Sequence, residues 1–158
     1  SPRVQRLIRK RLDLAKVERA IELTVRAGIN AHGFFMVGFP EETRQEIEET
    51  INFAARSKLV TAGFSRVIPF PGTELHAMLK ARGLSLPEGP EAYQAHSDTI
   101  HTAQVSPEEL VQLSRNAYRR FYFKPSRIWR ILRLSPKRML LLNSGKIARK
   151  ALTFPFSG

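Results

Sequence analysis

The sequence predicts an α/β fold in which short strands alternate with helices. Two stretches, 29–39 and 64–70, are rich in apolar and aromatic residues and have the length of strands, and helical patterns precede, separate and follow them. Alternation with short connections implies right-handed crossovers between parallel strands, either in an open doubly wound sheet or in part of a (β/α) barrel. Because two strands cannot close a barrel, we expect the chain to be part of a larger sheet.

The first two helices are indicated by capping residues and by charge. Asp13 is a suitable N-cap and Gly28 a suitable left-handed stop for a helix at 14–27. A second helix is expected at 41–57, where glutamates gather near the start and basic residues lie at the end. This distribution of charge complements the helix dipole.

The two strands are followed by different turns. The first strand, 29–39, shows no polar alternation, which is typical of a parallel strand that is covered on both faces. The second strand, 64–70, leads through Pro71-Gly-Thr into a short helix that ends at Gly83.

A loop and a well-marked helix follow. Residues 84–105 contain prolines and a glycine without a sustained period, so we expect a loop with a short extended piece at 98–102. Ser106-Pro-Glu-Glu109 is a capping box with proline at the first helical position. It starts a helix that ends before Pro125.

The remainder of the chain is expected to be a helical extension. Ser126 is a suitable cap for a helix at 127–134, and another turn or two are expected at 137–142. The expected parts of the chain are α/β units at 1–83, a linker at 84–105 and a basic helical extension at 106–158.

Composition excludes several classes of protein. The 158-residue chain has no cysteine, which excludes disulfides, thiolate metal sites and cysteine nucleophiles within these residues. No uncharged apolar run approaches the roughly 18 to 20 residues that span a bilayer, and the first residues lack the apolar core of a signal peptide. We therefore expect a cytoplasmic protein.

Positive charge is concentrated in the last third of the chain. Residues 110–158 contain 12 Lys and Arg and no Asp or Glu, whereas residues 1–109 contain 14 of each sign. This asymmetry indicates an anionic partner. Three interpretations stay open: peripheral contact with a membrane, contact with nucleic acid, or packing of the apolar residues on the missing part of the protein while the arginines stay solvated or meet acids there. Nucleic acid is the least favoured of the three.

The two strand-to-helix turns are the candidate ligand-binding positions, because ligands of parallel α/β folds bind at the carboxyl ends of the strands. Gly38 would let the backbone approach a ligand, and Glu41 is expected in the first turn of the next helix. Phe70 offers a flat apolar surface that suits a planar heterocycle such as adenine. A purely structural role for both turns is the alternative, and composition alone favours it.

No catalytic or metal-ligating group stands out. The four histidines are too scattered for a metal-ligand pattern, and neither Glu74 nor Asp98 has a paired acid. The sequence contains no nucleophile elbow and no phosphate-binding glycine loop. We therefore expect no catalytic residue and no metal ligand within this chain.

Four segments follow one another at consistent spacing: Ala27-Gly-Ile, Phe35-Met-Val-Gly-Phe-Pro-Glu-Glu-Thr, Ile51-Asn-Phe-Ala-Ala and Ile68-Pro-Phe-Pro-Gly-Thr-Glu-Leu. Together they resemble the fifth and sixth βα units of radical S-adenosylmethionine enzymes. The similarity is greatest to the branch that carries an N-terminal cobalamin-binding domain, and it extends through the helix after Ser106 to about residue 132. It implies the last βα units of a TIM-like partial (β/α) barrel at 1–83, followed by the helical extension.

The resemblance implies cofactor-binding roles for seven positions. Met36-x-Gly38-x-x-Glu41 is similar to the family's fifth-strand motif, whose backbone lies against the adenine of S-adenosylmethionine, although Phe34 stands where that motif has its first glycine. The end of the sixth strand helps to enclose the adenosyl group. The residues at that end are Val67, Ile68, Pro69 and Phe70.

The cofactors that the resemblance implies are S-adenosylmethionine, a [4Fe-4S] cluster and, for this branch, cobalamin. The family binds the cluster through Cys-x-x-x-Cys-x-x-Cys and uses it to cleave S-adenosylmethionine to a 5′-deoxyadenosyl radical. Because this chain has no cysteine, we expect a C-terminal fragment that is inactive alone, with the N-terminal half of the barrel upstream of Ser1.

The intact protein is expected to be a cobalamin-type radical methyltransferase or a related carbon-centred radical enzyme. Its expected substrate is a lipid, a tetrapyrrole-like compound or another small molecule. The alternative is a non-catalytic basic α/β module that binds an anionic membrane surface or nucleic acid.

Overall fold

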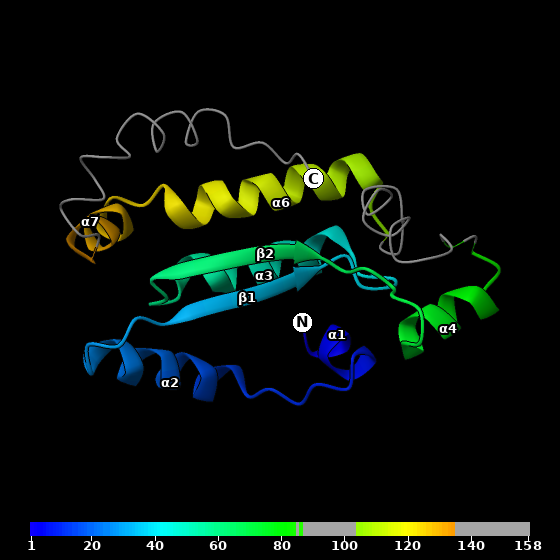
Figure 1. Ribbon diagram of the computed structural model, residues 1–158, viewed down its shortest axis with the longest axis horizontal. Coiled ribbons are helices and arrows are strands. Elements are labelled where there is room, and N and C mark those ends of the chain that lie inside the picture. The colour runs from blue at the N-terminus through cyan, green and yellow to red at the C-terminus, as the bar shows by residue number, and fades with distance from the viewer. Residues whose placement is uncertain (85, 87–103, 135–158) are drawn as a thin grey trace. The chain divides into compact units, whose positions relative to one another are not determined.

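The computed structural model of the protein describes residues 1–84, 86 and 104–134. The chain separates into two compact units, Ser1–Tyr122 and Phe123–Gly158. Helices and strands alternate in the first unit, which confirms the predicted α/β class (Figure 1).

The described elements follow the predicted order, with one additional helix at the start. The extended piece predicted at 98–102 and the helical turns predicted at 137–142 lie outside the described residues. The elements are α1 (Pro2–Leu7), α2 (Leu14–Arg26), β1 (His32–Val37), α3 (Arg44–Arg56), β2 (Thr61–Arg66), α4 (Glu74–Ala81) and α6 (Pro107–Tyr122) in the first unit, and α7 (Pro125–Leu134) in the second.

β1 and β2 form a parallel pair that is connected through α3. Their register pairs His32 with Thr61 at the start and Val37 with Arg66 at the end. The N–H of Val67 donates to the carbonyl of Val37 at 2.9 Å, so the pairing continues into the turn after β2. The carboxyl ends of both strands therefore lie at the same end of the sheet.

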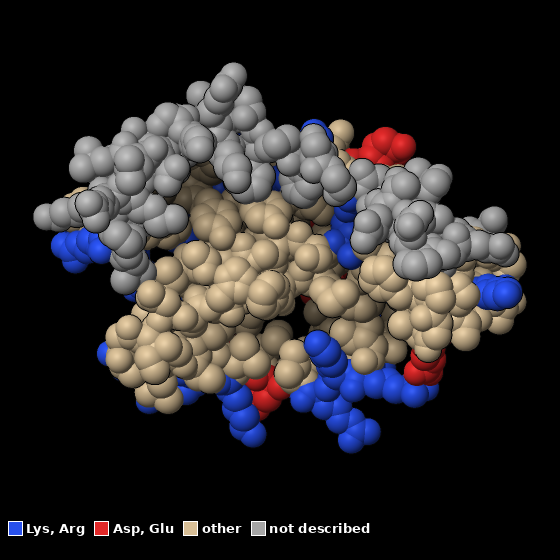
Figure 2. All heavy atoms as spheres, viewed as in Figure 1, with Lys and Arg blue, Asp and Glu red and all other residues tan. Residues whose placement is uncertain are grey.

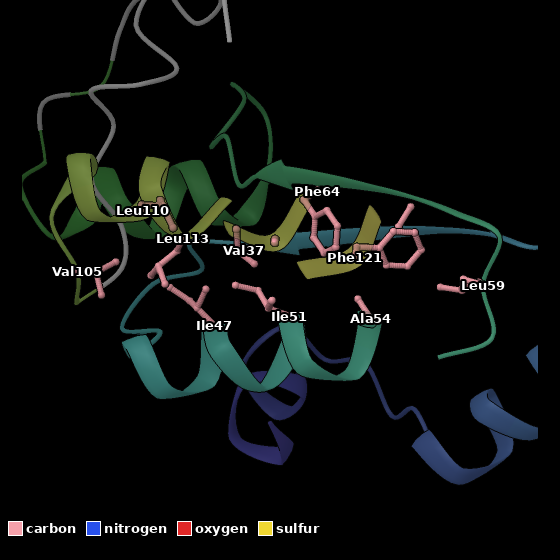
Figure 3. Packing of buried hydrophobic residues seen from close by; sticks show 12 residues of the cluster. Val37, Ile47, Ile51, Ala54, Leu59, Phe64, Val105, Leu110, Leu113 and Phe121 are labelled. Atoms are coloured by element: carbon pink, nitrogen blue, oxygen red, sulfur yellow. The ribbon is translucent and has the colours of Figure 1, made fainter. Parts of the chain in front are cut away.

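One face of this strand pair is buried under α3 and α6 (Figure 3). Ile47 and Ile51 of α3 belong to the same buried cluster as Phe121 of α6. Aromatic rings join the two strands to each other and to α6: Phe35 of β1 stacks on Phe64 of β2 with 5.3 Å between ring centroids, and Phe121 of α6 meets Phe64 edge-on at 6.1 Å. This apolar cluster fixes β1, β2, α3 and α6 as one layered core.

The other face of the strand pair is open in the described chain. Phe34 is 85% exposed and Met36 is 48% exposed, and His32 is exposed on the same face. The expectation that the first strand is covered on both faces is therefore wrong for the described residues. An apolar strand shows that both of its faces suit burial, but it does not show which segment of a protein covers them.

The outer edge of β2 is closed by two tyrosines of α6. The Tyr122 hydroxyl accepts a hydrogen bond from the N–H of Ala62 at 3.0 Å and donates to the carbonyl of the same residue at 2.8 Å. The Tyr118 hydroxyl makes the same two bonds with Phe64, at 3.1 and 3.3 Å. A further strand would need these backbone groups, so β2 cannot gain a neighbour on this edge while the tyrosines hold them.

The predicted strand boundaries change in the structure. β2 begins at Thr61 rather than at residue 64, because pairing with β1 extends the strand over small residues of low strand propensity. It ends at Arg66, so residues 67–70 form a turn rather than the end of a strand. β1 is correspondingly shorter than the predicted 29–39.

The predicted helix starts agree with the structure at some capping residues and differ at others. Asp13 accepts backbone N–H groups at the start of α2, and Gly28 follows its end with a φ of 80°, as predicted. α3 begins three residues later than predicted, because Thr43 and Glu46 form its capping box. α1, capped by Ser1, was not predicted, although a serine followed by proline is a helix-start signal.

Candidate ligand site at the strand ends

A buried carboxylate holds the turn that follows β1. Glu42 Oε2 accepts the backbone N–H of Gly38 at 2.6 Å and that of Phe39 at 3.0 Å. Glu42 is only 1% exposed. Burial raises the pKa of Glu42 above its ordinary value, although the two N–H groups favour the ionised form and oppose this shift. The turn is therefore fixed from within the chain before any ligand binds.

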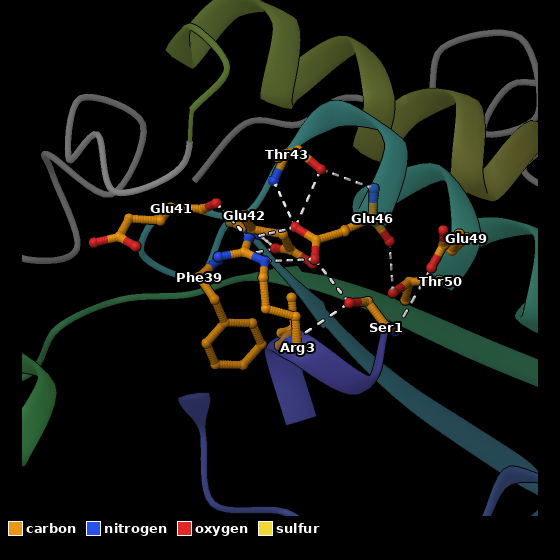
Figure 4. Close-up of polar contacts among 11 residues, drawn as sticks. Ser1, Arg3, Phe39, Glu41, Glu42, Thr43, Glu46, Glu49 and Thr50 are labelled. Carbon is orange, nitrogen blue, oxygen red and sulfur yellow. Dashed lines mark hydrogen bonds and ion pairs between the residues drawn. The ribbon is translucent and has the colours of Figure 1, made fainter. Parts of the chain in front are cut away.

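Glu41, a predicted site residue, points out of this turn (Figure 4). Its φ of 60° lies in the left-handed region. Its carboxylate pairs with Arg82 at 2.8 Å, and its carbonyl accepts a hydrogen bond from Arg3 at 2.6 Å. The prediction that Glu41 lies in the first turn of the helix is wrong, because α3 begins only after the cap at Thr43.

Glu46 connects α1 to the start of α3 (Figure 4). Arg3 donates to both carboxylate oxygens of Glu46, with 2.8 Å from Nε to Oε1. Thr43 donates to Oε2 from its N–H at 3.0 Å and from its hydroxyl at 3.1 Å, and the Ser1 hydroxyl donates to Oε1 at 2.7 Å. These donors, Arg3 foremost, hold the pKa of Glu46 far below its ordinary value. The turn after β1 thus has one carboxylate anchor at each end.

Gly38 is required by the fold on the core side of the turn. Its φ is 89°, a conformation that favours glycine. A Cβ built on Gly38 would lie 2.8 Å from Cδ2 of Leu110 in α6. The missing side chain therefore makes room for α6 rather than for a ligand, and any part that Gly38 has in ligand binding falls to its backbone.

The turn after β2 presents one large apolar side chain. Val67 and Pro69 are buried and Ile68 is partly buried, whereas Phe70 is 47% exposed. The Phe70 carbonyl accepts a 2.6 Å hydrogen bond from the Thr73 hydroxyl, and the Phe70 N–H donates to the Ile68 carbonyl at 3.0 Å. The backbone of this turn is fixed by its own hydrogen bonds while the Phe70 ring stays accessible.

The structure separates the predicted site residues into two groups. Met36 and Phe70 expose apolar surface near the strand ends, and the surface over β1 and β2 is formed by uncharged residues (Figure 2). The other predicted residues are buried, partly buried or, like Glu41, paired elsewhere. Glu42 was missed as the residue that shapes the turn. The signal that could have found it is the capping box, which places the residue before Thr43 outside the helix.

Of the implied cofactors, the apolar strand ends suit S-adenosylmethionine better than the iron–sulfur cluster. A flat, accessible ring at Phe70 and the exposed Met36 fit the planar adenine of S-adenosylmethionine. An iron–sulfur cluster does not fit this chain, because the sequence has no cysteine to ligate it. In the part of the chain that the structure describes, no three His, Asp or Glu residues come together as a metal site.

These features describe a parallel α/β segment whose strand ends carry the candidate ligand site. Residues 1–54 match the Radical SAM superfamily. The match ends within α3, so it includes the turn that Glu42 holds.

Two curated relatives are methyltransferases by name. An uncharacterized methyltransferase of Pyrococcus horikoshii is 33% identical over 125 residues, which are 79% of this chain and 27% of the relative. A bacteriochlorophyllide d C-8(2)-methyltransferase of Chlorobaculum tepidum is 27% identical over 92 residues, which are 58% of this chain and 20% of the relative. The chain thus spans about a quarter of the length of the relatives that it matches.

Proposed function

We propose that this chain forms the S-adenosylmethionine-binding side of a radical enzyme whose cluster ligands lie in an upstream part of the same polypeptide. The match of residues 1–54 to the Radical SAM superfamily supports an enzyme. The absence of cysteine from this chain and its 27% coverage of the first relative support a division of the active site between two parts of one protein. This chain alone is then inactive.

The observation that carries the proposal is the combination of an open face and a closed edge in one strand pair. Phe34 and Met36 expose apolar surface on the open face, while tyrosine hydroxyls occupy the outer edge of β2. Upstream strands would pair with β1 and curve over the open face. The chain is then the last two βα units of a partial (β/α) barrel, and the open face becomes the barrel interior.

In this arrangement the residues of the chain bind and orient the adenosyl group. Phe70, with Ile68 beside it, packs against adenine, and Met36 contacts the ligand from the barrel interior. The backbone from Gly38 to Glu41 passes along the edge of the base, and Glu42 holds it in place. S-adenosylmethionine supplies the reactive methyl or adenosyl group, and the cluster ligands come from outside this chain.

Methyl transfer is the reaction class that the two relatives support, because both carry that name. We assign the intact protein to the cobalamin-type radical methyltransferases or to related carbon-centred radical enzymes, with cobalamin as a further cofactor bound upstream. A tetrapyrrole-like, lipid or other small-molecule substrate fits this assignment, since one relative is named for a bacteriochlorophyllide.

The proposal is tested by the affinity of the intact protein for S-adenosylmethionine, measured by isothermal titration calorimetry. Phe70→Ala should weaken binding about tenfold, because the variant loses a large apolar contact with the base. Phe123→Ala is the matched control, since Phe123 is also an exposed phenylalanine but belongs to neither strand-to-helix turn. Equal affinities in the two variants would remove Phe70 from the site.

A basic binding module without catalysis is the second candidate function. The observation in its favour is the set of 12 cations without an acid in residues 110–158. An intact protein that binds an anionic partner but shows no heat of binding with S-adenosylmethionine would support this candidate and contradict the first.

A further inference from the structure

The amphipathic helix α7, in the second unit, exposes its apolar face. Ile128 and Leu132 are one helical turn apart and Trp129 lies beside them, so the three side chains share one face. All three are exposed, Trp129 to 59%. On the polar side, by contrast, Arg127 is only 7% exposed. Within the described residues, α7 thus exposes its apolar face while one of its arginines is buried.

An exposed apolar face bordered by cations indicates an interaction surface. The guanidinium carbon of Arg133 lies 4.9 Å from the centre of the Trp129 ring, so a cation and an amphipathic ring stand side by side. The surrounding sequence strengthens the positive field, because residues 110–158 have 12 Lys and Arg and no acid.

We propose that α7 docks on an anionic lipid bilayer, with its apolar face in the boundary between headgroups and acyl chains. Trp129 suits this depth, since tryptophan combines an apolar ring with a polar N–H group. Arg133 can extend along the helix surface and keep its charge among the phosphates. The proposal does not depend on the assignment of S-adenosylmethionine to the strand ends.

The length of α7 determines how it can lie on a membrane. Its 10 residues correspond to roughly 15 Å, about half the thickness of the hydrocarbon core, so the helix lies in the plane of the interface. Among the helices that the structure describes, none has both the length and the apolar character needed to cross a bilayer.

A bilayer accounts for the apolar face better than nucleic acid does. Phosphates of nucleic acid would satisfy the arginines, but they offer nothing to the aliphatic side chains of Ile128 and Leu132. A bilayer surface offers both apolar depth and negative charge. A bilayer therefore accounts for both the apolar face and the arginines of α7.

Co-sedimentation of the intact protein with vesicles tests this proposal. We expect binding to vesicles of phosphatidylcholine and phosphatidylserine, and much weaker binding to phosphatidylcholine alone. Trp129→Asp should weaken the binding at least about tenfold, because it places a charge on the apolar face. Arg133→Glu, an exposed change that keeps the apolar face intact, should weaken it at least about fivefold.

Lys80→Glu is the matched control for charge. Lys80 is an exposed cation on α4, and its reversal changes the net charge as much as Arg133→Glu does. Absence of binding by the wild-type protein, or equal binding by the Lys80 and Arg133 variants, would overturn the proposal. Loss of RNA binding with unchanged vesicle binding in the α7 variants would also overturn it, in favour of nucleic acid.

Discussion

The carboxylate of Glu42 lies 2.6 Å from the backbone nitrogen of Gly38, four residues earlier in the chain. This short contact turns the chain at the end of β1 and directs it toward α3. Glu42 is buried, so the carboxylate acts as an internal brace of the turn rather than as a group offered to a ligand. The shape of the candidate site on this side thus depends on a residue that no ligand needs to touch.

Removing the Glu42 brace should open the turn locally. Glu42→Ala leaves the N–H groups of Gly38 and Phe39 without their acceptor, at a cost of about 2 kcal/mol in the free energy of local opening. Glu42→Gln keeps one acceptor oxygen and should cost less than about 1 kcal/mol. Native-state hydrogen exchange of these two amides in the intact protein measures both effects. Equal protection in the two variants would contradict the role of the carboxylate.

Gly38→Ala should destabilise the protein more than Gly72→Ala. Both glycines have positive φ, 89° and 82°, so each change costs about 1 kcal/mol of backbone strain. Only the Cβ at position 38 also meets Leu110, whereas the one at Gly72 meets no atom within 4 Å. In urea unfolding, the free energy of unfolding should be about 1 kcal/mol lower for Gly38→Ala than for Gly72→Ala. Adding Leu110→Ala to both variants should reduce that difference.

Acid should weaken the link between α1 and α3 through Glu46. The pKa of Glu46 is depressed in the folded protein, so the stability that this carboxylate contributes is present above its unfolded pKa, near pH 4.3, and is lost as the pH falls further. We expect the urea midpoint to fall as the pH is lowered from about 4.5 toward 2, and to fall less in Glu46→Gln. Glu48→Gln, on the exposed side of the same helix, serves as the control. If the urea midpoint fell equally in both variants, the Arg3–Glu46 pair would not be the source of the acid sensitivity.

The tyrosines of α6 should hold the edge of β2 through their hydroxyls alone. Tyr118→Phe and Tyr122→Phe keep the rings but leave the backbone groups of Phe64 and Ala62 unpaired, at about 1 to 2 kcal/mol each. Hydrogen exchange at the Ala62 and Phe64 amides should accelerate in the corresponding variant. Unchanged exchange would mean that another group protects this edge.

Much of the fold could be predicted because local signals agree with the structure. Asp13, Thr73 and Ser106 are polar caps whose positions follow directly from the helical pattern, and the helices after them form as expected. The parallel arrangement also follows from alternation with short connections.

The features of the fold and the site that the sequence does not predict depend on contacts between residues distant in the chain. Thr61 begins β2 only because β1 lies beside it, and a sequence of small residues does not indicate such pairing. In the site, Glu41 and Glu42 are adjacent and chemically identical, yet one pairs at the surface with Arg82 and the other is buried under the turn. Glu41 adopts the left-handed conformation, and the sequence carries no signal of that conformation.

Photoaffinity labelling of the intact protein with an azidoadenine analogue of S-adenosylmethionine tests the central claim most directly. Mass spectrometry after trypsin digestion should find the label in peptides 27–44 and 67–80, which contain Met36 and Phe70. Excess S-adenosylmethionine should abolish this labelling. Competable labelling that is confined to peptides upstream of Ser1 would contradict the assignment of the adenosyl site to this chain.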